Sequence, residues 1–587
     1  WMEYLTAYQK DPSSFNTVGD GIYVDESGVP YYLNEKDLYK NFMETSFQMT
    51  HNISASGGTD KLRYRISGGY NSNDGVLISD RDKFERMNVN SFISADVTKW
   101  FTQEITMSYA HSLQTSPGGM GGVYNTRLVS YYPEGELPAS VNTLADEDLP
   151  LFTPRNQILY SNPVNNKNDN PRIFLKSILK PLKGLEAVFE YTFDKNIYDY
   201  HWYTGQYDYT TIQGGSSKSF VDDYLRKYKQ HTNYNSINVY ATYNKDFGNH
   251  HFKVMAGFNQ ESSYQETLDT YSYNQAVLDV PAMSSGTGTI KATDSYSEYA
   301  IRGGFFRVNY NYLDKYLAEI NFRSDASSKF GPGNQRGYFP SISLGWRMSS
   351  ENFMADTEKV DDLKLRFSWG QTGSTNIDDF VYRQFYEKGN PYIGQSTLTP
   401  GLLPNPDIKW ERTSEFNGGL DYAFFNHRLF GSIDGYYRYT KGALAPSPYP
   451  LESGSTSYTS NLIDLSNKGV EIEIGGDIIR TADWTWTSKF NIALNRNKIE
   501  KLNGAELSSN DVDTYIEGQP AGVLKGYIVE KIFQNDDEVV TLNKTAVARG
   551  ANYYQEKSTG MGDFKYKDLD GNGYIDSKDR EVIATPQ

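Results

Sequence analysis

Strict alternation of apolar and polar residues constrains this chain more than any other sequence feature. It is clearest in residues 363–370, where an apolar set alternates with a charged or small set: Leu363, Leu365, Phe367 and Trp369 against Lys364, Arg366, Ser368 and Gly370. Successive side chains of a β-strand point to opposite faces, so this pattern predicts a strand with one apolar and one polar face. Soluble β-sandwiches and membrane-spanning β-barrels both contain such strands, so the choice between them depends on the rest of the chain.

The same period recurs along most of the sequence. Between residues 45 and 498 we count about sixteen such strands of about ten residues each, a length typical of barrel strands. No run reaches the roughly 18 apolar residues that a membrane-spanning helix needs. The sequence therefore predicts an all-β fold.

The connections between the predicted strands alternate between short and long. The short ones are residues 57–60, 98–99, 182–184, 247–250, 313–315, 425–427 and 481–483. The long ones are residues 72–83, 112–171, 198–230, 265–294, 328–337, 372–409 and 441–465. Outer-membrane barrels have short periplasmic turns and long extracellular loops, so we predict a transmembrane, antiparallel, up-and-down β-barrel. Residues 349–362 should form a short turn but are long, and we expect a short helix there.

Composition supports the membrane alternative and excludes several function classes. The chain has 48 tyrosines and is 15% aromatic, and Tyr and Trp favour the boundary between hydrocarbon and water. Its 57 basic and 73 acidic residues give a net charge of -16, so it lacks the basic surface that a nucleic-acid partner requires. It contains no cysteine, which excludes disulfides and thiolate chemistry within this sequence.

The sequence indicates an internal piece of a longer protein with three parts. No signal peptide follows Trp1, and no closing strand precedes Gln587. We expect residues 1–44 to be an extracellular loop segment. Residues 45–498 would contain the barrel strands with their loops and turns, and residues 499–587 an extracellular loop region.

A motif in that last region points to a metal. Residues 568–579 (DLDGNGYIDSKD) match the ligand spacing of a twelve-residue calcium loop, in which Gly573 permits the sharp turn. The oxygen donors would be the side chains of Asp568, Asp570, Asn572, Asp576 and Asp579 and the carbonyl of Tyr574. The match departs from the usual loop because it ends in Asp rather than Glu and follows a strand-like segment. We predict structural Ca²⁺; the alternative is a surface turn held by side-chain hydrogen bonds.

Charged residues on the polar face of the predicted strands would line the lumen of a barrel. The candidates are Arg63, Arg65, Glu319, Arg323, Lys364, Arg366, Glu471 and Glu473. They could guide a substrate, but we favour a solvated wall with cross-strand ion pairs. Tyrosine-rich stretches at residues 124–135, 198–211 and 271–275 could stack on sugar rings or grip peptides. For these the favoured alternative is an outer aromatic girdle with packing between loops.

No catalytic motif stands out. The sequence lacks the G-x-S-x-G, P-loop, G-x-G-x-x-G and H-E-x-x-H patterns, and its seven histidines are scattered. We therefore do not expect an enzyme.

Five segments in order along the chain resemble a known family, the SusC/RagA-like TonB-linked outer-membrane transporters of Bacteroidota. They are residues 51–77, 302–354, 363–377 (LKLRFSWGQTGSTNI), 404–444 and 562–583 (GDFKYKDLDGNGYIDSKDREVI). The resemblance implies a barrel of about 22 strands in the bacterial outer membrane, of which about sixteen are in this sequence. It also implies an N-terminal plug contacting TonB, which with the remaining strands would lie outside this sequence.

The function implied by the resemblance is active import. A SusD-like surface lipoprotein would act as a lid, and the ligand would be an oligosaccharide or a peptide. Outer-membrane lipid is an implied partner and nucleic acid is not. The alternatives are a TonB-dependent siderophore or cobalamin receptor, and a non-transport adhesin or structural protein displayed on a barrel.

Overall fold

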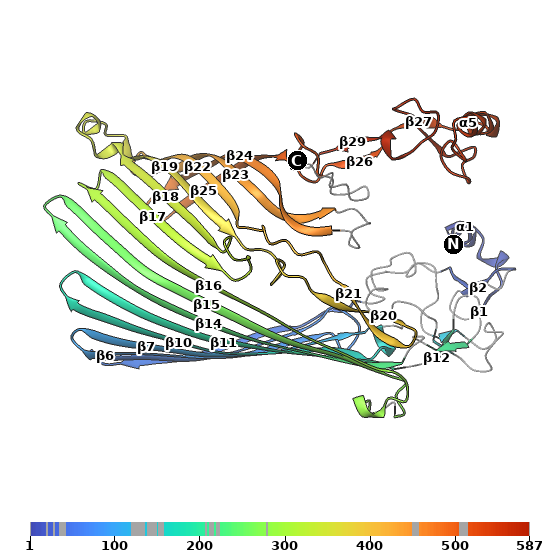
Figure 1. The fold of residues 1–587 in the computed structure, drawn as a ribbon, viewed down its shortest axis with the longest axis horizontal. Helices are drawn as coiled ribbons and strands as arrows, with labels where there is room; N and C mark the ends of the chain where they lie inside the picture. Colours follow the sequence, from blue (N-terminus) through green and yellow to red (C-terminus); the bar gives the residue numbers. More distant parts are fainter. Residues whose placement is uncertain are drawn as a thin grey trace. The chain divides into compact units, whose positions relative to one another are not determined.

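The computed structural model describes most of the chain (Figure 1). The residues it does not describe are 1, 19–21, 27–29, 34–42, 119–135, 138–148, 151–157, 206–207, 211–215, 219–222, 278–279, 449–456, 504–514 and 586–587. The chain divides into two compact units. Unit 1 comprises Trp1–Val239 and Asn259–Tyr299, and unit 2 comprises Tyr240–Phe258 and Ala300–Gln587.

One sheet of sixteen strands dominates the structure, and its strand order follows the chain order. Its first eight strands are β4 (Gln48–Gly58), β5 (Leu62–Asp74), β6 (Lys83–Thr98), β7 (Phe101–Pro117), β10 (Pro163–Leu182), β11 (Leu185–Thr204), β14 (Tyr224–Phe247) and β15 (His250–Tyr273). The other eight are β16 (Ile290–Tyr312), β17 (Tyr316–Ser327), β18 (Arg336–Arg347), β19 (Val360–Ser374), β22 (Glu411–Phe424), β23 (Leu429–Pro448), β24 (Ser457–Arg480) and β25 (Thr485–Lys501). This antiparallel, up-and-down order is the predicted one.

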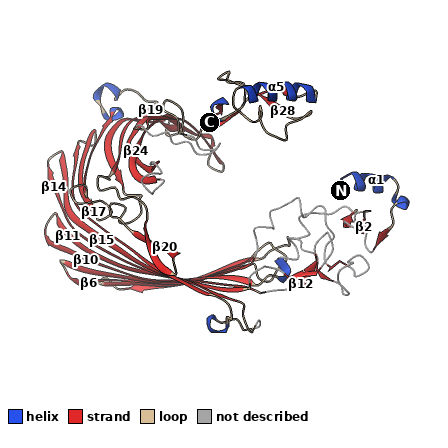
Figure 2. Ribbon diagram, turned by 45° about the vertical axis from the view of Figure 1, so that its right-hand side comes forward, coloured by secondary structure: helices blue, strands red, loops and turns tan. Residues whose placement is uncertain are grey.

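Outside the large sheet the regular structure consists of short elements. Figure 2 shows how little of the chain is helical. In the described part of the chain the helices include α1 (Met2–Lys10), α5 (Asp536–Ala548) and the 3-10 turns η1 (Pro12–Ser14), η3 (Met283–Ser285), η4 (Met348–Ser350), η5 (Asn352–Met354) and η7 (Ser577–Asp579). One small sheet has three strands, β1 (Thr17–Val18), β2 (Ile22–Val24) and β3 (Pro30–Tyr32). The other small sheets have two strands each: β8 (Glu136–Leu137) with β9 (Leu149–Pro150), β12 (Asp208–Thr210) with β13 (Ser216–Lys218), β20 (Tyr386–Tyr392) with β21 (Gln395–Pro400), β26 (Leu524–Tyr527) with β29 (Arg580–Ala584), and β27 (Val529–Ile532) with β28 (Phe564–Tyr566). No helix in the described part of the chain is long and apolar enough to cross a bilayer.

The register in unit 2 keeps like side chains together across strands. Ile320 pairs with Ile342, which pairs with Trp369. On the other face Glu319 pairs with Ser343, which pairs with Ser368. We call these two faces the apolar face and the charged face. A shift of one residue in register would exchange them, so the alternation fixes the pairing.

Unit 1 has the same two faces. Ile93 pairs with Ile105, which pairs with Leu175 on the apolar face. Glu104 pairs with Lys176, which pairs with Glu190 on the charged face.

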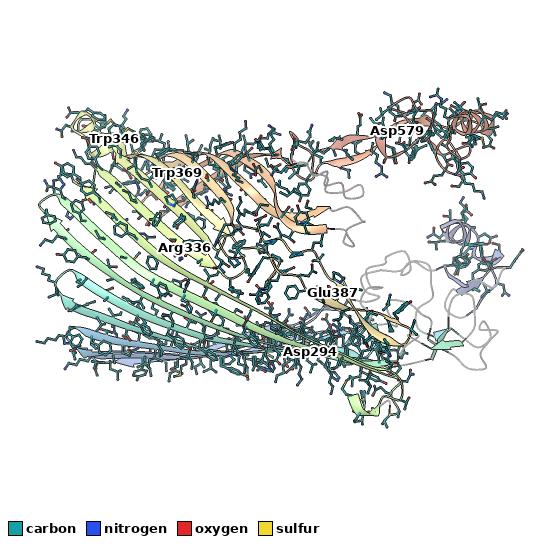
Figure 3. The ribbon with its side chains drawn as sticks, viewed as in Figure 1. Asp294, Arg336, Trp346, Trp369, Glu387 and Asp579 are labelled. Atoms are coloured by element: carbon teal, nitrogen blue, oxygen red, sulfur yellow. The ribbon has the colours of Figure 1, made fainter. Side chains whose placement is uncertain are left out.

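In the part of the chain that the structure describes, no second sheet packs against the apolar face of β17–β19. Figure 3 draws the side chains that project from these strands. For example, 45% of the surface of Phe367 is exposed. The buried clusters lie elsewhere. One is formed by Phe330, Phe339, Ile377, Ile408 and Trp410, where long connections meet the ends of β18, β19 and β22. Another, of Phe533, Val539, Ala546 and Tyr554, packs α5 onto the short strands near the end of the chain.

Two segments have structure that the sequence pattern did not specify, and a third contains the short helical turns that were expected there. Residues 1–44, expected as a loop segment, contain α1 and the sheet of β1–β3. Residues 349–362, where a short helix was expected, contain the end of η4, all of η5 and the start of β19. Residues 499–587, expected as a loop region, contain α5 and four short strands. These segments lack the long period-two pattern that identified the sheet.

Candidate functional site

An aromatic patch lies on the charged face of unit 1, at the ends of β11, β14 and β15. Its members are Tyr198, Tyr200, Trp202, Tyr224, Tyr228, Tyr271 and Tyr273. The β11 members occupy alternate positions, and Tyr198 and Tyr200 pair with Asn168 and Asn166 of β10. The same face of β10 and β11 carries Lys176 and Glu190. The aromatic patch therefore lies on the charged face of the sheet, opposite the apolar face.

The rings of the aromatic patch contact one another across strands. The ring centroids of Trp202 and Tyr224 are 5.4 Å apart, and those of Tyr224 and Tyr273 are 5.6 Å apart. The centroids of Tyr198 and Tyr228 are 5.9 Å apart. These spacings are those of favourable aromatic pairs. Mutual packing limits the rotation of each ring, so the surface is largely formed before any ligand arrives.

Arg226 of β14 fixes the centre of the aromatic patch. Its Nε and Nη2 donate to the two carboxylate oxygens of Asp269 at 3.0 and 2.9 Å, a bidentate pair. Its guanidinium carbon also lies 5.1 Å from the ring centroid of Tyr271 and 5.3 Å from that of Tyr200. Both separations are within the range of cation–π attraction. Arg226 thus ties β11, β14 and β15 together through these contacts.

The sequence pattern predicted part of this patch, but as loop residues. Residues 198–204 belong to β11 and residues 271–273 to β15, so these aromatics are strand residues. The third tyrosine-rich stretch, residues 124–135, lies outside the described residues. The period-two spacing of Tyr198, Tyr200 and Trp202 was a usable signal for a strand. Nothing local in the sequence indicated that Arg226 and Asp269 would meet.

The register places the eight charged candidates on the charged face, in two separate groups. Arg63 and Arg65 lie on β5 in unit 1, whereas Glu319, Arg323, Lys364, Arg366, Glu471 and Glu473 lie on strands of unit 2. Several are engaged within the sheet. Arg366 bonds Asp421 at 2.8 Å and Asp434 at 3.0 Å, and Arg323 bonds Asp325 at 2.8 Å. Glu319 accepts hydrogen bonds from Asn309 and Asn321.

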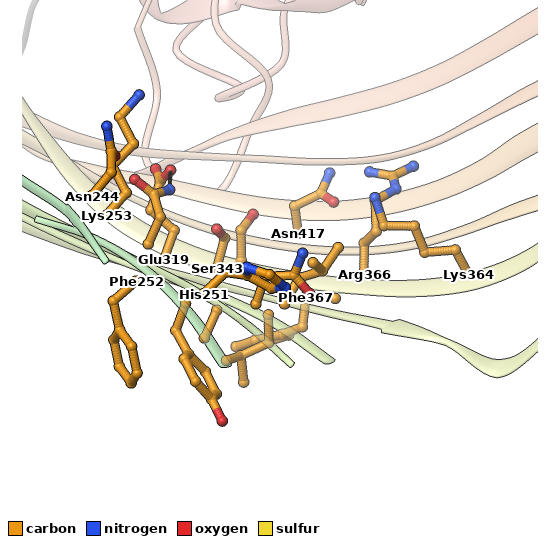
Figure 4. Close-up of a pocket in the computed structure, with 18 of the residues that line it drawn as sticks. Asn244, His251, Phe252, Lys253, Glu319, Ser343, Lys364, Arg366, Phe367 and Asn417 are labelled. Carbon is orange, nitrogen blue, oxygen red and sulfur yellow. Dashed lines mark hydrogen bonds between the residues drawn. The ribbon is translucent and has the colours of Figure 1, made fainter. Parts of the chain in front are cut away.

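Figure 4 shows the surroundings of Lys364 and Arg366. Arg366, Asn417 and Lys253 project to one side of the sheet, whereas Phe252 projects to the other. Side chains of both faces therefore line this hollow, which has a volume of about 630 Å³. Of the eight charged candidates, Glu319, Lys364 and Arg366 line this hollow. Because its rings pack against one another, we take the aromatic patch as the better-formed surface.

The predicted calcium loop gathers some of its proposed ligands. Carboxylate oxygens of Asp568, Asp570 and Asp579 lie within 4.8 Å of one another, and Asp579 is fully buried. Asp568 accepts backbone hydrogen bonds from Gly571 and Gly573, each at 2.7 Å. Asp579 accepts from the backbone of Leu569 at 2.7 Å and of Asp576 at 2.8 Å.

The other proposed ligands are held less directly. Asn572 bridges Asp570 and Asp576 through its amide nitrogen. Asp576 caps η7, its carboxylate accepting from the backbone of Lys578, and is not part of the three-carboxylate group. Crowding three like charges is unfavourable without a cation, and hard oxygen donors suit Ca²⁺. The residues present therefore fit this metal.

Comparison with known proteins gives a consistent result. A family model described as TonB dependent receptor-like, beta-barrel, matches residues 139–578. The TonB-dependent receptor SusC of Bacteroides thetaiotaomicron is 30% identical over 595 residues, covering 94% of this chain and 56% of that protein. The TonB-dependent receptor P3 of Formosa agariphila is 29% identical over 569 residues, covering 91% of this chain and 54% of that protein. The chain spans about half the length of these curated relatives.

A solved structure shares the fold. The structure of the RagAB peptide transporter is similar with a TM-score of 0.75 at 20% sequence identity, over 91% of this chain and 59% of that one. The long meander of antiparallel strands is thus also found in a solved structure.

Proposed function

The chain belongs to the TonB-dependent receptor-like β-barrel family, and on that premise we propose that it forms most of the wall of an active importer of the SusC/RagA type. The family's members are outer-membrane proteins, so the apolar face contacts lipid and the charged face lines the interior. In this proposal TonB pulls on a plug that lies outside the present sequence. That force opens a path along the charged face.

We further propose that the imported ligand is an oligosaccharide, with a peptide as the alternative. The aromatic patch is the observation that supports this choice. Tyr and Trp rings offer flat apolar surfaces to sugar rings while their polar atoms remain available for hydroxyl groups. Arg226 is already paired with Asp269, so the patch presents rings rather than a free charge. That character suits a neutral ligand.

Import by the full-length protein tests the proposal. The protein would be expressed in cells lacking their own copy and given a panel of labelled neutral oligosaccharides and of peptides of matched mass. Replacing Tyr200 and Tyr271 together by alanine should weaken uptake about tenfold, because each stacked ring contributes about 0.5–1.5 kcal/mol. Tyr296→Ala is the matched control, since Tyr296 is a β16 tyrosine outside the patch with 70% of its surface exposed.

The possible outcomes test the proposed import activity and the proposed substrate separately. Unchanged oligosaccharide uptake by the double variant would reject the patch as the binding surface. Loss confined to the peptides would retain the importer and make peptides its ligands. Uptake that persists in cells without TonB would reject the energised mechanism itself.

A SusD-like lipoprotein is the proposed partner. It would close over the long connections of the barrel, capture the ligand and deliver it to the aromatic patch, which lies where β11, β14 and β15 meet those connections. Affinity purification of the full-length protein from its native membrane should therefore recover a surface lipoprotein in equal amount. Recovery of the receptor alone would argue against the lid.

We also propose that residues 568–579 hold structural Ca²⁺. The metal would be bound by the carboxylates of Asp568, Asp570 and Asp579, with Asn572, Asp576 and the carbonyl of Tyr574 completing the shell. Calcium should slow proteolysis of this segment in the full-length protein, and Asp568→Ala with Asp570→Ala should abolish that protection. Glu581→Ala, an exposed carboxylate on neighbouring β29, should leave it intact. Equal cleavage with calcium and with a chelator would reject the site.

A further inference from the structure

A basic pocket opens on unit 2 at the ends of β18, β22 and β23. The cavity has a volume of about 510 Å³, and its cations are Arg336, Lys409, Arg412 and Lys441. All four are exposed. Asp464 is the acidic residue among its lining residues, so the pocket carries a clear excess of positive charge.

Among the residues that the structure describes, no carboxylate neutralises the positive charge of the basic pocket. None of its four cations forms an ion pair with a carboxylate in the described part of the chain. Arg336 donates instead to the hydroxyl of Ser324 at 2.9 Å. Asp464 already accepts hydrogen bonds from the Tyr439 hydroxyl at 3.1 Å and from the backbone of Gly442 at 2.7 Å.

The positions of these cations make their lack of partners costly. Arg412 and Lys441 are direct partners in the β22–β23 register, and like charges directly opposite one another destabilise a sheet. Several other charged residues of the sheet in unit 2 are paired, as Arg438 is with Glu415 at 2.7 Å. An anion from outside the chain would relieve the repulsion in the basic pocket.

The face on which the basic pocket lies indicates where that anion comes from. Arg336 shares its side of β18 with Ile342 and Leu344, because these residues are separated by even numbers of positions. By the same rule Arg412 shares its side of β22 with Phe416. Lys441 shares its side of β23 with Tyr437 and Ile433. Three of the four cations therefore lie at the end of the apolar face.

The positions of these cations along their strands also indicate the level of the basic pocket in the membrane. Arg336 begins β18 and Arg412 lies at the start of β22, each after a long connection, and long connections are extracellular in outer-membrane barrels. The exposed ring of Tyr437 lies on the same face of β23, four residues before Lys441, as expected for an aromatic belt at the headgroup level. The basic pocket thus sits at the outer-leaflet boundary, above hydrocarbon.

We propose that the basic pocket binds the phosphate groups of a lipid of the outer leaflet. Arg336 and Arg412 would present guanidinium groups to phosphate oxygens, for which their planar donor geometry is suited, and the lysines would add charge. The acyl chains would lie along the apolar face next to Phe416 and Ile433, both exposed. The inference depends on the outer-membrane location and not on the proposed import activity.

Lipid retention by the full-length protein tests the proposal. The purified protein would be placed in bilayers of neutral phosphatidylcholine containing a small fraction of phosphatidic acid, and bound lipid would be counted by native mass spectrometry. Arg412→Gln with Lys441→Gln should reduce retention of the phosphorylated lipid about tenfold or more, because charge-assisted contacts to phosphate are lost. The charge-preserving exchange Arg412→Lys with Lys441→Arg should keep the retention of the phosphorylated lipid. Lys544→Gln, which removes a cation on α5, should keep it as well.

Each result bears on the proposal. Equal retention by the double glutamine variant and the parent would overturn it, and so would equal retention of neutral and phosphorylated lipid. Inorganic phosphate that displaces the lipid completely at equal concentration would also overturn it, because the pocket would then be a site for free anions. If the double variant fails to fold, Arg336→Gln and Lys409→Gln provide the same test outside the β22–β23 register pair.

Discussion

Arg366 illustrates how single residues hold the charged face together. Its guanidinium donates to both carboxylate oxygens of Asp421 at 2.8 Å and to Asp434 at 3.0 Å, which links β19, β22 and β23. Its register partner is Gly419, where an added Cβ would lie 2.8 Å from Arg366 Nη2. Glycine at that position therefore makes room for the ion pairs. These partly exposed pairs favour, for this residue, the solvated wall over a substrate guide.

Phe367 and Lys364 provide the residue-scale prediction. Phe367 lies on the apolar face between Leu365 and Trp369, whereas Lys364 lies on the charged face. Phe367→Lys should lower the free energy of unfolding by about 2–4 kcal/mol if its position is near the bilayer midplane, because the ammonium group would enter hydrocarbon. Lys364→Ala should change it little. Denaturant titration of the full-length protein in lipid vesicles measures both, and equal costs would refute the assignment of the two faces.

At the scale of elements, residues 524–584 form a small module with its own core. Tyr554 is 4% exposed within it and donates its hydroxyl to the Tyr566 carbonyl at 2.8 Å. Lys531 pairs with Glu538 of α5 at 2.8 Å, which lowers the pKa of that carboxyl through a hydrogen bond. Arg549, just after α5, donates to the Gly571 carbonyl at 2.7 Å and so ties the helix to the predicted calcium loop. Helix, short strands and loop therefore depend on one another.

Tyr554 makes the stability of this module depend on alkaline pH. Burial raises the pKa of its hydroxyl from 10.0 to about 12. Because the folded value is the higher one, its stabilising contribution is complete below the unfolded pKa of 10.0 and is lost as pH rises through about 12. Alkaline proteolysis of residues 524–584 in the intact protein, mapped by mass spectrometry, should therefore accelerate across that interval.

Substitution isolates the hydroxyl as the cause. Tyr554→Phe should be cleaved faster than the parent at neutral pH, since the hydrogen bond to Tyr566 is lost, but should lack the added alkaline step. Tyr553→Phe, at the exposed neighbouring position, should keep that step. An alkaline step of unchanged size in Tyr554→Phe would assign it to another group.

Elements also show what the sequence could and could not predict. The long strands were visible because a period of two is a local property, as in Leu363 to Gly370. The three-residue connection 313–315 was visible too, although not its left-handed backbone at Leu313 and Asp314. The contact of Arg226 with Asp269 spans 43 positions and depends on the register of β14 with β15. The basic pocket joins residues of five separate segments, and no local sequence pattern predicts that they come together.

At the scale of the whole molecule, the outward apolar side chains determine the environment. Phe490, Leu494 and Val470 are exposed members of the apolar face on β24 and β25, and in the part of the chain that the structure describes no second sheet covers the face. Water would make such a surface costly, at about 25 cal/mol for each square ångström of apolar area. Hydrocarbon removes that cost, which agrees with the outer-membrane location.

Cysteine labelling tests this environment directly, because the sequence has no cysteine of its own. Single cysteines would be placed at Leu365, Phe367 and Trp369 and, on the other face, at Lys364, Arg366 and Ser368. In native membranes a charged, water-soluble maleimide should react with the second set and spare the first, since lipid excludes both the reagent and the thiolate. After denaturation all six should react, which controls for expression. Faster reaction of the first set would mean that water covers the apolar face, and a soluble sandwich would then replace the barrel.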